Sequence, residues 1–398
     1  MTRLVFLLFL LAAAAAPALA QDSRPRDVRF QGAPRFGSAE GWSLKPRGRL
    51  QYDFGHISRP GGVTVAGLGS VEELRRARIG IEGTMPGGFG YVFEIDLAPD
   101  VVEFTDAFLT YKASSRITLT AGQHNNFQSL DELTSSRFSS FIERAAFTDA
   151  FNFERRVGVS GTYVDGPLTA QLGVFHDNFL DIDETDDAVS IDGRLVYAPR
   201  LGATQLHFGG SAHWRDNGPP AATRYRQRPL LHATDVRFVA TPSLAVDSET
   251  GFGLEAAMIR GPFHATGEAH WMNAGTAAGP GRTFFGAYVE AGWFLTGETR
   301  GYRGARWDRT RVRRAIEEGG FGALQAVVRY DYLDLDSGPV RGGTQNGLQA
   351  SLIWIPTDYV RFLVNYARLS YEGAAIPAAA GDRSYRVDAV GVRAQLDW

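Results

Sequence analysis

The chain has 398 residues, of which 44% are hydrophobic and 21% charged, and its mean hydropathy of −0.17 excludes a bundle of membrane-spanning helices. The 41 basic and 44 acidic side chains leave a net charge of −3, so bulk electrostatics gives no reason to expect a nucleic acid as partner. Cysteine is absent, and all but two of the 41 basic residues are arginines, the lysines being Lys45 and Lys112. No linker divides the chain, and we expect one large domain.

The N-terminus has the features of a secretory signal. Arg3 precedes an unbroken apolar run over residues 4–16, and a Pro-Ala-Leu-Ala segment follows at 17–20. The run is too short to span a bilayer, and the small-residue site before a polar stretch favours cleavage over an uncleaved anchor. We therefore expect a signal peptide over 1–20, removed on export.

From about residue 44 onward, apolar and polar side chains alternate with a period of two, as they do in half-buried strands. Phe89, Tyr91 and Phe93 share one face, for example, while Glu94 and Asp96 lie on the other. Sixteen segments follow this pattern: 44–55, 71–84, 88–98, 102–113, 116–124, 155–164, 167–177, 188–199, 202–214, 250–260, 262–272, 283–297, 321–333, 347–356, 359–371 and 385–398.

The connections between these segments alternate in length, with tight turns such as 86–88 and 261–262 at one end and mostly longer loops at the other. This alternation is typical of an outer-membrane barrel. Segment 223–240 resembles a further strand, but Pro229 interrupts it, so we assign 215–249 to a long fifth loop. The fold class expected is all-β: a transmembrane antiparallel β-barrel of about 16 strands over 44–398, preceded by a short periplasmic segment over 21–43.

One connection departs from the alternation. The link over 298–320 is long, although it belongs to the end with short turns, and it holds seven arginines. Such a segment either folds upward into the lumen or stays as a solvated basic loop at the inner rim. The sequence leaves both alternatives open.

Several motifs resemble those of one known family. Gly122-Gln123, residues 130–137 (LDELTSSR), 141–144 (FIER) and 155–158 (RRVG) resemble the third-loop signature of the phosphate-selective porin O and P family, and 75–83 (RRARIGIEG) resembles its second strand. The similarity extends over nearly all of the chain after the signal. It implies a 16-stranded barrel, a homotrimer, and a third loop that folds inward to narrow the pore. In that family the fifth loop also enters the barrel.

The strand parity then predicts which side chains line the pore. If the apolar faces meet lipid, Arg76, Arg78 and Glu82 point inward together, whereas Arg75 has the other parity and belongs near a rim or at a bulge. Guanidinium groups stay protonated and offer several donors to phosphate or carboxylate oxygens. The residues expected to line the pore or bind anions are Arg75, Arg76, Arg78, Lys112, Ser135, Ser136, Arg144, Arg156, Arg226 and Arg228.

Acidic residues complicate this interpretation. Glu255, Glu268 and Glu290 have the inward parity on later strands, so they are expected to oppose the arginines across the pore, or to pair with them and hold loops against the wall. Phosphate-selective relatives use lysines together with arginines, but no lysine follows Lys112 here. We therefore expect general anion passage rather than a phosphate trap.

Other constellations are weaker. His124 with the Ser135-Ser136 pair suggests a barrel-embedded hydrolase, but no Gly-x-Ser-x-Gly motif surrounds those serines. His264 and His270 share a parity but lie roughly 20 Å apart along an extended strand, so one metal ion cannot bridge them. A sugar-specific channel would need a row of lumen aromatics, and a soluble β-sandwich lectin shows the same alternation of side chains.

The sequence therefore predicts a passive outer-membrane porin of a Gram-negative bacterium that needs no cofactor, metal or catalytic residue. The expected permeants are small inorganic anions, with phosphate and polyphosphate among the candidates, and outer-membrane lipid and lipopolysaccharide are the expected surroundings. The alternative is a general, weakly selective porin for small hydrophilic solutes.

Overall fold

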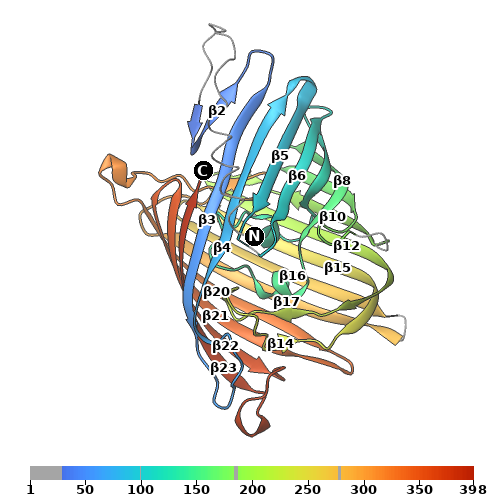
Figure 1. Ribbon diagram of the computed structural model, residues 1–398. Coiled ribbons are helices and arrows are strands. Elements are labelled where there is room, and N and C mark those ends of the chain that lie inside the picture. The colour runs from blue at the N-terminus through green and yellow to red at the C-terminus, as the bar shows by residue number, and fades with distance from the viewer. Residues whose placement is uncertain (1–28, 99, 183–186, 277–278) are drawn as a thin grey trace, which may run out of the picture.

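The computed structural model describes residues 29–98, 100–182, 187–276 and 279–398, so the expected signal peptide lies outside the described residues. Within these ranges, sixteen antiparallel strands pair in chain order and the last pairs with the first, which closes a barrel (Figure 1). The strands are β3 (Ser43–Ile57), β4 (Gly69–Met85), β5 (Phe89–Asp96), β6 (Glu103–Lys112), β7 (Ile117–Asn125), β8 (Arg155–Asp165), β9 (Leu168–Phe175), β10 (Val189–Tyr197), β12 (Thr204–Thr223), β15 (Leu244–Arg260), β16 (Phe263–Thr276), β17 (Gly279–Phe294), β20 (Ala323–Ser337), β21 (Val340–Thr357), β22 (Val360–Glu372) and β23 (Tyr385–Asp397).

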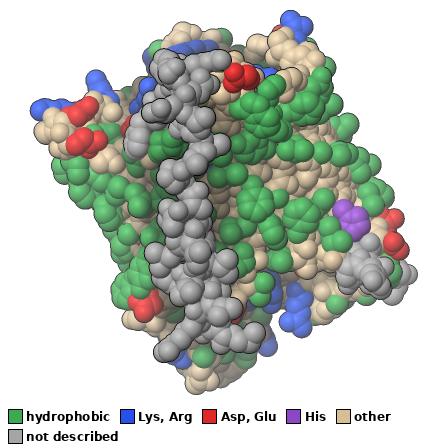
Figure 2. Space-filling view, turned by 45° about the horizontal axis from the view of Figure 1, so that its top comes forward, with side chains coloured by type: hydrophobic (Ala, Val, Ile, Leu, Met, Phe, Trp, Pro, Cys, Tyr) green, Lys and Arg blue, Asp and Glu red, His purple; other side chains and the backbone are tan. Residues whose placement is uncertain are grey.

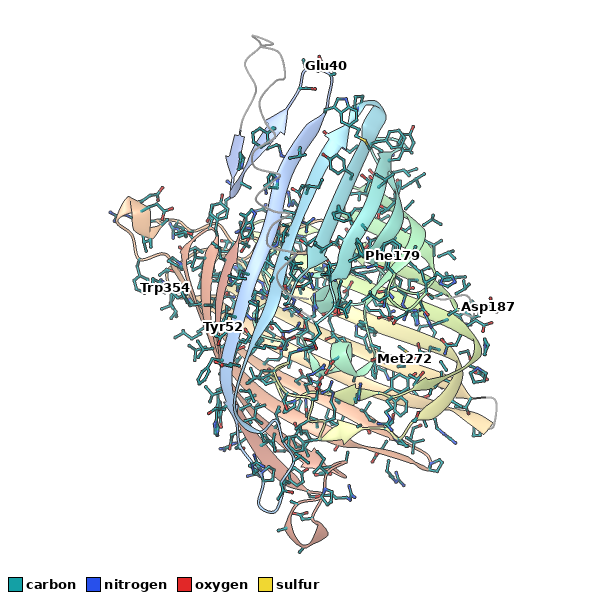
Figure 3. The ribbon with its side chains drawn as sticks, in the orientation of Figure 1. Glu40, Tyr52, Phe179, Asp187, Met272 and Trp354 are labelled. Atoms are coloured by element: carbon teal, nitrogen blue, oxygen red, sulfur yellow. The ribbon has the colours of Figure 1, made fainter. Side chains whose placement is uncertain are left out.

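The outer surface of the barrel is apolar because each strand exposes every second side chain. On β22, Phe362, Val364 and Tyr366 are exposed, whereas Leu363 and Asn365 between them are buried inside. Figure 2 shows hydrophobic side chains spread over the outer face and charged ones gathered toward its two ends. Tyr52 and Trp354 lie on the outer side of the wall in Figure 3. This is the surface that a membrane barrel presents to lipid.

All sixteen predicted segments are confirmed as strands, but the predicted loop over 215–249 is too long. β12 continues to Thr223 and β15 already begins at Leu244, because pairing resumes at Ala221 and Val246 after an irregularity that follows Asp216. Pro219 and Pro220 fall inside this irregularity, where a missing N–H breaks no ladder hydrogen bond. The remaining loop is 224–243.

Smaller elements accompany the barrel. They are β1 (Arg29–Gln31), β2 (Ala33–Gly37), β11 (Arg200–Leu201), β13 (Arg226–Gln227), β14 (Val239–Ala240), β18 (Gly301–Arg303), β19 (Arg306–Asp308), α2 (Leu130–Leu133), α3 (Ala146–Ala150), η1 (Pro86–Gly88), η2 (Ile316–Glu318) and η3 (Ala379–Gly381). β2 pairs with the start of β3 and extends the sheet beyond the barrel. In the part of the chain that the structure describes, no helix has the length and apolar character to cross a membrane.

Two long connections fill part of the interior. Residues 126–154 between β7 and β8, which form the predicted third loop, cross the lumen, and residues 224–243 pack beside them. Their buried side chains, such as Phe141, Phe147 and Leu231, form an apolar core with the inner faces of the later strands. Gly55 and Gly391 make room for this packing, since a Cβ at either position would lie within 2.7 Å of the Leu231 side chain. The inward folding of the third loop is confirmed.

Because the core fills the half of the lumen beside the later strands, open space is left beside the earlier ones, β3 to β10. The side chains that the sequence places there are mostly polar or charged. The fold thus confines any pathway through the barrel to an off-centre passage along the first eight strands.

Candidate functional site

Two cavities lie on either side of the third loop. The larger has a volume of about 530 Å³ and is lined by β3 to β10, by the third loop and by the β18–β19 hairpin. The smaller, of about 160 Å³, lies between the third loop and residues 227–232 of the fifth. Arg144 lines both cavities, so the region around its guanidinium separates them.

Many of the residues predicted to line the pore border these cavities. Arg76, Arg78, Ser135 and Ser136 line the larger one, Arg75 and Arg228 line the smaller one, and Arg144 lines both. Ser135 and Ser136 also accept hydrogen bonds from Arg49, at 3.3 and 2.8 Å, which fixes this part of the third loop against β3.

Three of the residues predicted to line the pore do not border the two cavities. Lys112 is exposed at the end of β6, and Arg226 is exposed on the fifth loop, so neither borders the two cavities. Arg156 pairs with Glu154 at 3.3 Å and is also absent from their linings. Its neighbour Arg155 lines the larger cavity and lies 2.7 Å from Asp106.

A β-bulge in β4 explains how two consecutive arginines both reach the interior. Gln51 of β3 pairs with Arg76, but its neighbour Tyr52 pairs with Leu74, which leaves Arg75 as the extra residue. Leu74 and Ile79, on either side of the bulge, both face outward although their parities differ. The bulge that the sequence offered as one explanation for Arg75 is therefore present, and it aims Arg75 at Glu143, 2.8 Å away.

Among the residues that the structure describes, ten arginines line the larger cavity, against three acids. Seven of them were not among the residues predicted from the sequence to line the pore: Arg47, Arg49, Arg137, Arg155, Arg194, Arg303 and Arg306. Strand parity could have predicted Arg47 and Arg49, since both have the inward parity on β3 together with Gln51. The positions of Arg303 and Arg306 depend on how residues 298–320 fold, and no local sequence pattern predicts that.

Most of these arginines are compensated by a carboxylate. Arg49 and Arg78 lie 3.3 and 3.5 Å from Glu94, and Arg78 also lies 2.7 Å from Asp96. By contrast, three lining arginines have no carboxylate within 4.0 Å among the described residues: Arg76, Arg137 and Arg306. These three arginines, on β4, the third loop and the β18–β19 hairpin, are uncompensated in the sense that no direct ion pair neutralises them; Glu143 acts on Arg76 only from beyond 4.0 Å.

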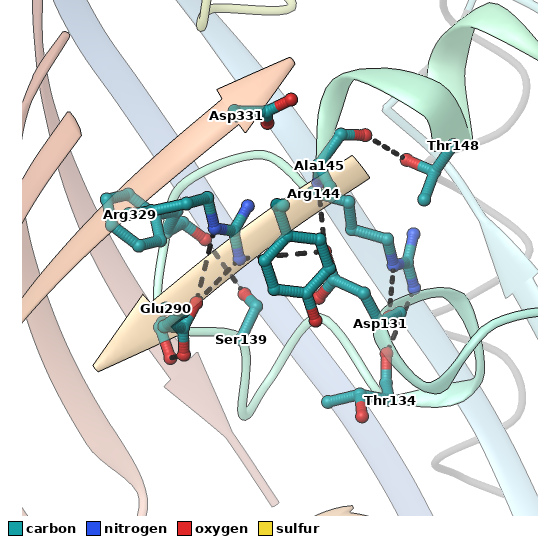
Figure 4. A network of polar contacts seen from close by, with 12 residues as sticks. Asp131, Thr134, Ser139, Arg144, Ala145, Thr148, Glu290, Arg329 and Asp331 are labelled. Carbon is teal, nitrogen blue, oxygen red and sulfur yellow. Dashed lines mark hydrogen bonds and ion pairs between the residues drawn. The ribbon is translucent and has the colours of Figure 1, made fainter. Parts of the chain in front are cut away.

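The third loop is tied to the wall by many hydrogen bonds. Asn365 of β22 accepts from the Ile142 N–H at 2.7 Å, Asp331 of β20 accepts from the Ala146 N–H at 3.0 Å, and Arg361 donates to the carbonyl oxygen of Ser139. Figure 4 shows the centre of this network, where Arg144 donates to main-chain oxygens of the loop itself, among them Asp131 and Thr134. These bonds satisfy main-chain groups that water cannot reach, and they fix the loop in the lumen.

The three acids of the later strands serve this anchoring. Glu268 accepts 2.8 Å bonds from the N–H groups of Leu130 and Asp131 at the start of α2. Glu290 lies 2.9 and 2.8 Å from Arg300 and Arg329, and Glu255 lies 2.7 Å from Arg194. All three are buried and none borders the two cavities. Of the two roles that the sequence left open for these acids, the contacts favour pairing with arginines and holding loops against the wall over facing the arginines across the pore.

The long turn-end segment folds into the lumen, which settles the alternative left open above. Its β18–β19 hairpin reaches Arg194 of β10, which donates to the Ala305 carbonyl at 2.8 Å. Trp307 is buried against Leu130 of the third loop, and the Arg300 guanidinium lies 4.1 Å from its ring centre. Arg309 pairs with Asp397 of the last strand. The hairpin therefore meets the third loop from the opposite end of the barrel.

Carboxyl groups on the third loop respond differently to this environment. Burial raises the pKa of Asp131 and of Glu132, although Arg329 and Arg144 respectively oppose the shift. Burial acts in the same direction on Glu143, but Arg75, Arg76 and Arg393 surround it and hold its pKa well below the ordinary value of 4.5. Glu143 is thus a fixed negative charge at the junction of the loop with β4 and β23.

The weaker constellations do not assemble. His124 contacts Ser160 rather than Ser135 or Ser136, at 2.8 Å. His264 contacts Arg300 and Gln325, whereas His270 lies beside Glu268, so the two histidines have separate surroundings. Among the described residues, no group of three or more side chains is placed to hold a metal ion.

Comparison with known proteins identifies the family. The profile of the family described as "Phosphate-selective porin O and P" matches residues 44–398. The chain belongs to this family. It is 46% identical over 398 residues to a protein of Caulobacter vibrioides, which covers 97% of this chain and 80% of the relative. It is also 28% identical over 345 residues to Porin O of Pseudomonas aeruginosa, covering 76% and 75% of the two chains.

Solved structures agree on the fold. An anion-selective porin from Comamonas acidovorans has a TM-score of 0.59 at 13% identity, covering 90% of this chain and all of the other. Pseudomonas putida OprB has a TM-score of 0.58 at 8% identity, covering 90% and 94%. The protein is therefore an outer-membrane porin, and by the rule for such barrels its short turns mark the periplasmic end and its third and fifth loops the extracellular end.

Proposed function

We propose that the porin is a passive diffusion channel for small anions. The observation that carries this proposal is the lining of the larger cavity, where ten arginines and three acids lie among the described residues. A fixed positive field in a narrow passage attracts anions and repels cations, and ion pairing along the wall keeps each binding site shallow enough for release. The family description supports an anion as permeant, and makes phosphate the first to test.

The lining favours general anion passage over a tight phosphate trap. Arginine is the basic residue that lines both cavities, and most of its guanidinium groups are already engaged by carboxylates such as Glu94 and Asp106. Those carboxylates would repel a doubly charged anion at close range. Polyphosphate remains a candidate permeant on charge alone, and a general, weakly selective porin is the alternative.

The remaining features of the proposal concern the assembled protein. We infer a homotrimer surrounded by outer-membrane lipid and lipopolysaccharide, with residues 1–20 removed as a signal peptide and 21–43 in the periplasm. One structural neighbour, Vibrio cholerae OmpT, is described in a trimer form. We further propose that the protein has no enzymatic role and requires no cofactor. N-terminal sequencing of the exported protein tests the cleavage, which should leave Gln21 first.

The central experiment is planar-bilayer conductance of the purified porin under a KCl gradient, followed by addition of phosphate. The proposal expects a reversal potential that favours chloride, and only weak block by phosphate. Strong block at low phosphate concentration would instead establish a phosphate site built without lysine. Equal passage of potassium and chloride would overturn anion selectivity and favour the general porin.

A further inference from the structure

The larger cavity has an aromatic wall in addition to its arginines. Phe108 of β6, His124 of β7 and Phe127 of the third loop all line it. The ring centroids of Phe108 and His124 are 5.8 Å apart, and those of His124 and Phe127 are 6.3 Å apart. Behind them, Phe175 of β9 lies 5.1 Å from His124 and completes a continuous cluster.

A second β-bulge turns Phe108 toward this cavity. Glu94 pairs with Asp106 and Ile95 pairs with Phe104, so Thr105 is the extra residue of β6. Phe104 and Leu109 both face outward although their parities differ, and the side chains from Asp106 onward therefore point the other way from a regular strand. Phe108 would face lipid without the bulge. In the barrel it is half-buried and borders the space inside.

Aromatic rings and guanidinium groups also meet at the other walls of the cavity. Phe138 of the third loop has Arg137 and Arg309 at 5.2 and 5.3 Å from its ring centre. Trp307 of the hairpin lines the same cavity, and the Arg300 guanidinium lies over its ring. The cavity thus offers both ring faces and cationic planes within one volume of about 530 Å³, which lies in the range of sites that take small organic molecules.

We propose that this cavity recognises small organic anions that carry an aromatic ring, such as arene carboxylates and aryl phosphates. This inference rests on the proposed anion channel and specifies its permeant. Passage of inorganic ions requires charge and a suitable radius, but no aromatic wall. A solute ring would pack on the uncovered part of Phe108, which Phe127 supports from behind, or on an arginine plane. Its carboxylate or phosphate would accept hydrogen bonds from uncompensated guanidinium groups such as Arg76 and Arg137.

The role of the rings in packing does not account for the whole arrangement. Phe175 is fully buried and supports the third loop without reaching the cavity. Phe108, by contrast, is only half-buried and leaves part of its ring uncovered toward the passage. A side chain needed only for packing would gain more from complete burial.

The test compares how anions block the chloride current through the full-length porin in planar bilayers. Benzoate and phenyl phosphate are compared with acetate and methyl phosphate, which have the same charged groups without a ring, and benzyl alcohol serves as the uncharged ring. We expect the aryl anions to block at concentrations about tenfold lower than their alkyl counterparts, and benzyl alcohol not to block.

Two variants locate the effect. Phe108→Leu keeps an apolar side chain but removes the ring, and should reduce the aryl preference severalfold. Phe93→Leu is the matched control, because Phe93 lies on the lipid-facing side of the neighbouring strand and is 42% exposed. Equal block by aryl and alkyl anions in the unmodified porin would overturn the inference while leaving the anion channel intact. Loss of anion preference altogether would overturn the proposed function as well.

Discussion

The three uncompensated arginines give a sharp test of how the channel selects charge. Arg76 has no carboxylate within 4.0 Å among the described residues, and it donates to the Gln51 side chain at 2.9 Å. A monovalent anion passing at about 6 Å from such a charge gains roughly 0.7 kcal/mol in water, and a cation loses the same amount. Arg76→Gln should therefore lower the anion-to-cation permeability ratio about tenfold at low salt.

The matched control removes both partners of an ion pair instead of a guanidinium that has no direct ion pair. Arg78 lies two residues further along β4 and pairs with Asp96 at 2.7 Å. The double variant Arg78→Gln, Asp96→Asn removes one positive and one negative charge, so the ratio should stay nearly unchanged. Reversal potentials in a KCl gradient measure both variants. The Arg76→Gln effect should also shrink in 1 M salt, where the screening length is about 3 Å.

An equal fall of the permeability ratio in the double variant and in Arg76→Gln would contradict this prediction. That outcome would mean that a guanidinium acts on passing ions regardless of the carboxylate beside it, and that the count of lining arginines alone sets selectivity. Heat-modifiable migration of both variants should confirm that the barrel is folded before the currents are compared.

Three further predictions concern the loops. Glu268→Gln should lower the free energy of unfolding by about 1–3 kcal/mol, because the carboxylate accepts two charge-assisted bonds from α2. Thermal loss of heat-modifiable migration measures it, and Glu372→Gln, the same change at an exposed carboxylate at the end of β22, is the comparison. Trp307→Ala should raise single-channel conductance, since the ring holds the hairpin against the third loop; unchanged conductance would show that the hairpin stays in place without it. The ion pair of Arg75 with Glu143 stabilises the folded barrel above pH 4.5, because Glu143 has a lower pKa in the folded than in the unfolded protein. This stabilisation is lost as the pH falls through the folded pKa. Glu143→Gln should therefore abolish this part of the pH dependence of unfolding in acid.

The fold was predictable because a barrel wall repeats one local rule. Each strand must offer an apolar face to lipid, so alternation at Phe362, Val364 and Tyr366 recurs around the whole wall. Boundaries failed only where a strand loses its alternation near a loop, as in β12 after Asp216. There the pairing of β12 with β15 resumes at Ala221, in a stretch where the side chains no longer alternate, so the side-chain pattern does not predict it.

The pore lining was predictable only where strand parity holds. Parity placed Arg76 and Arg78 correctly in the interior, and the clash of parities around Arg75 indicated the bulge. It could not place Arg137 or Arg306, because both lie on segments whose path depends on contacts more than a hundred residues away. Lys112 is the last residue of β6, and an exposed side chain at the end of a strand lies at the rim rather than beside the cavities.

The acids of the later strands show why parity alone misjudges function. An inward carboxylate meets whatever fills the lumen, and beside β16 and β17 that is the third loop and the β18–β19 hairpin rather than water. The main-chain N–H groups of α2 need acceptors once they are buried, and Glu268 supplies them. Glu290 in turn holds Arg300 of the hairpin. The carboxylates of this wall therefore fix the third loop and the hairpin in place. Because these loops lie between the carboxylates and the open passage, the passage is lined mainly by arginines.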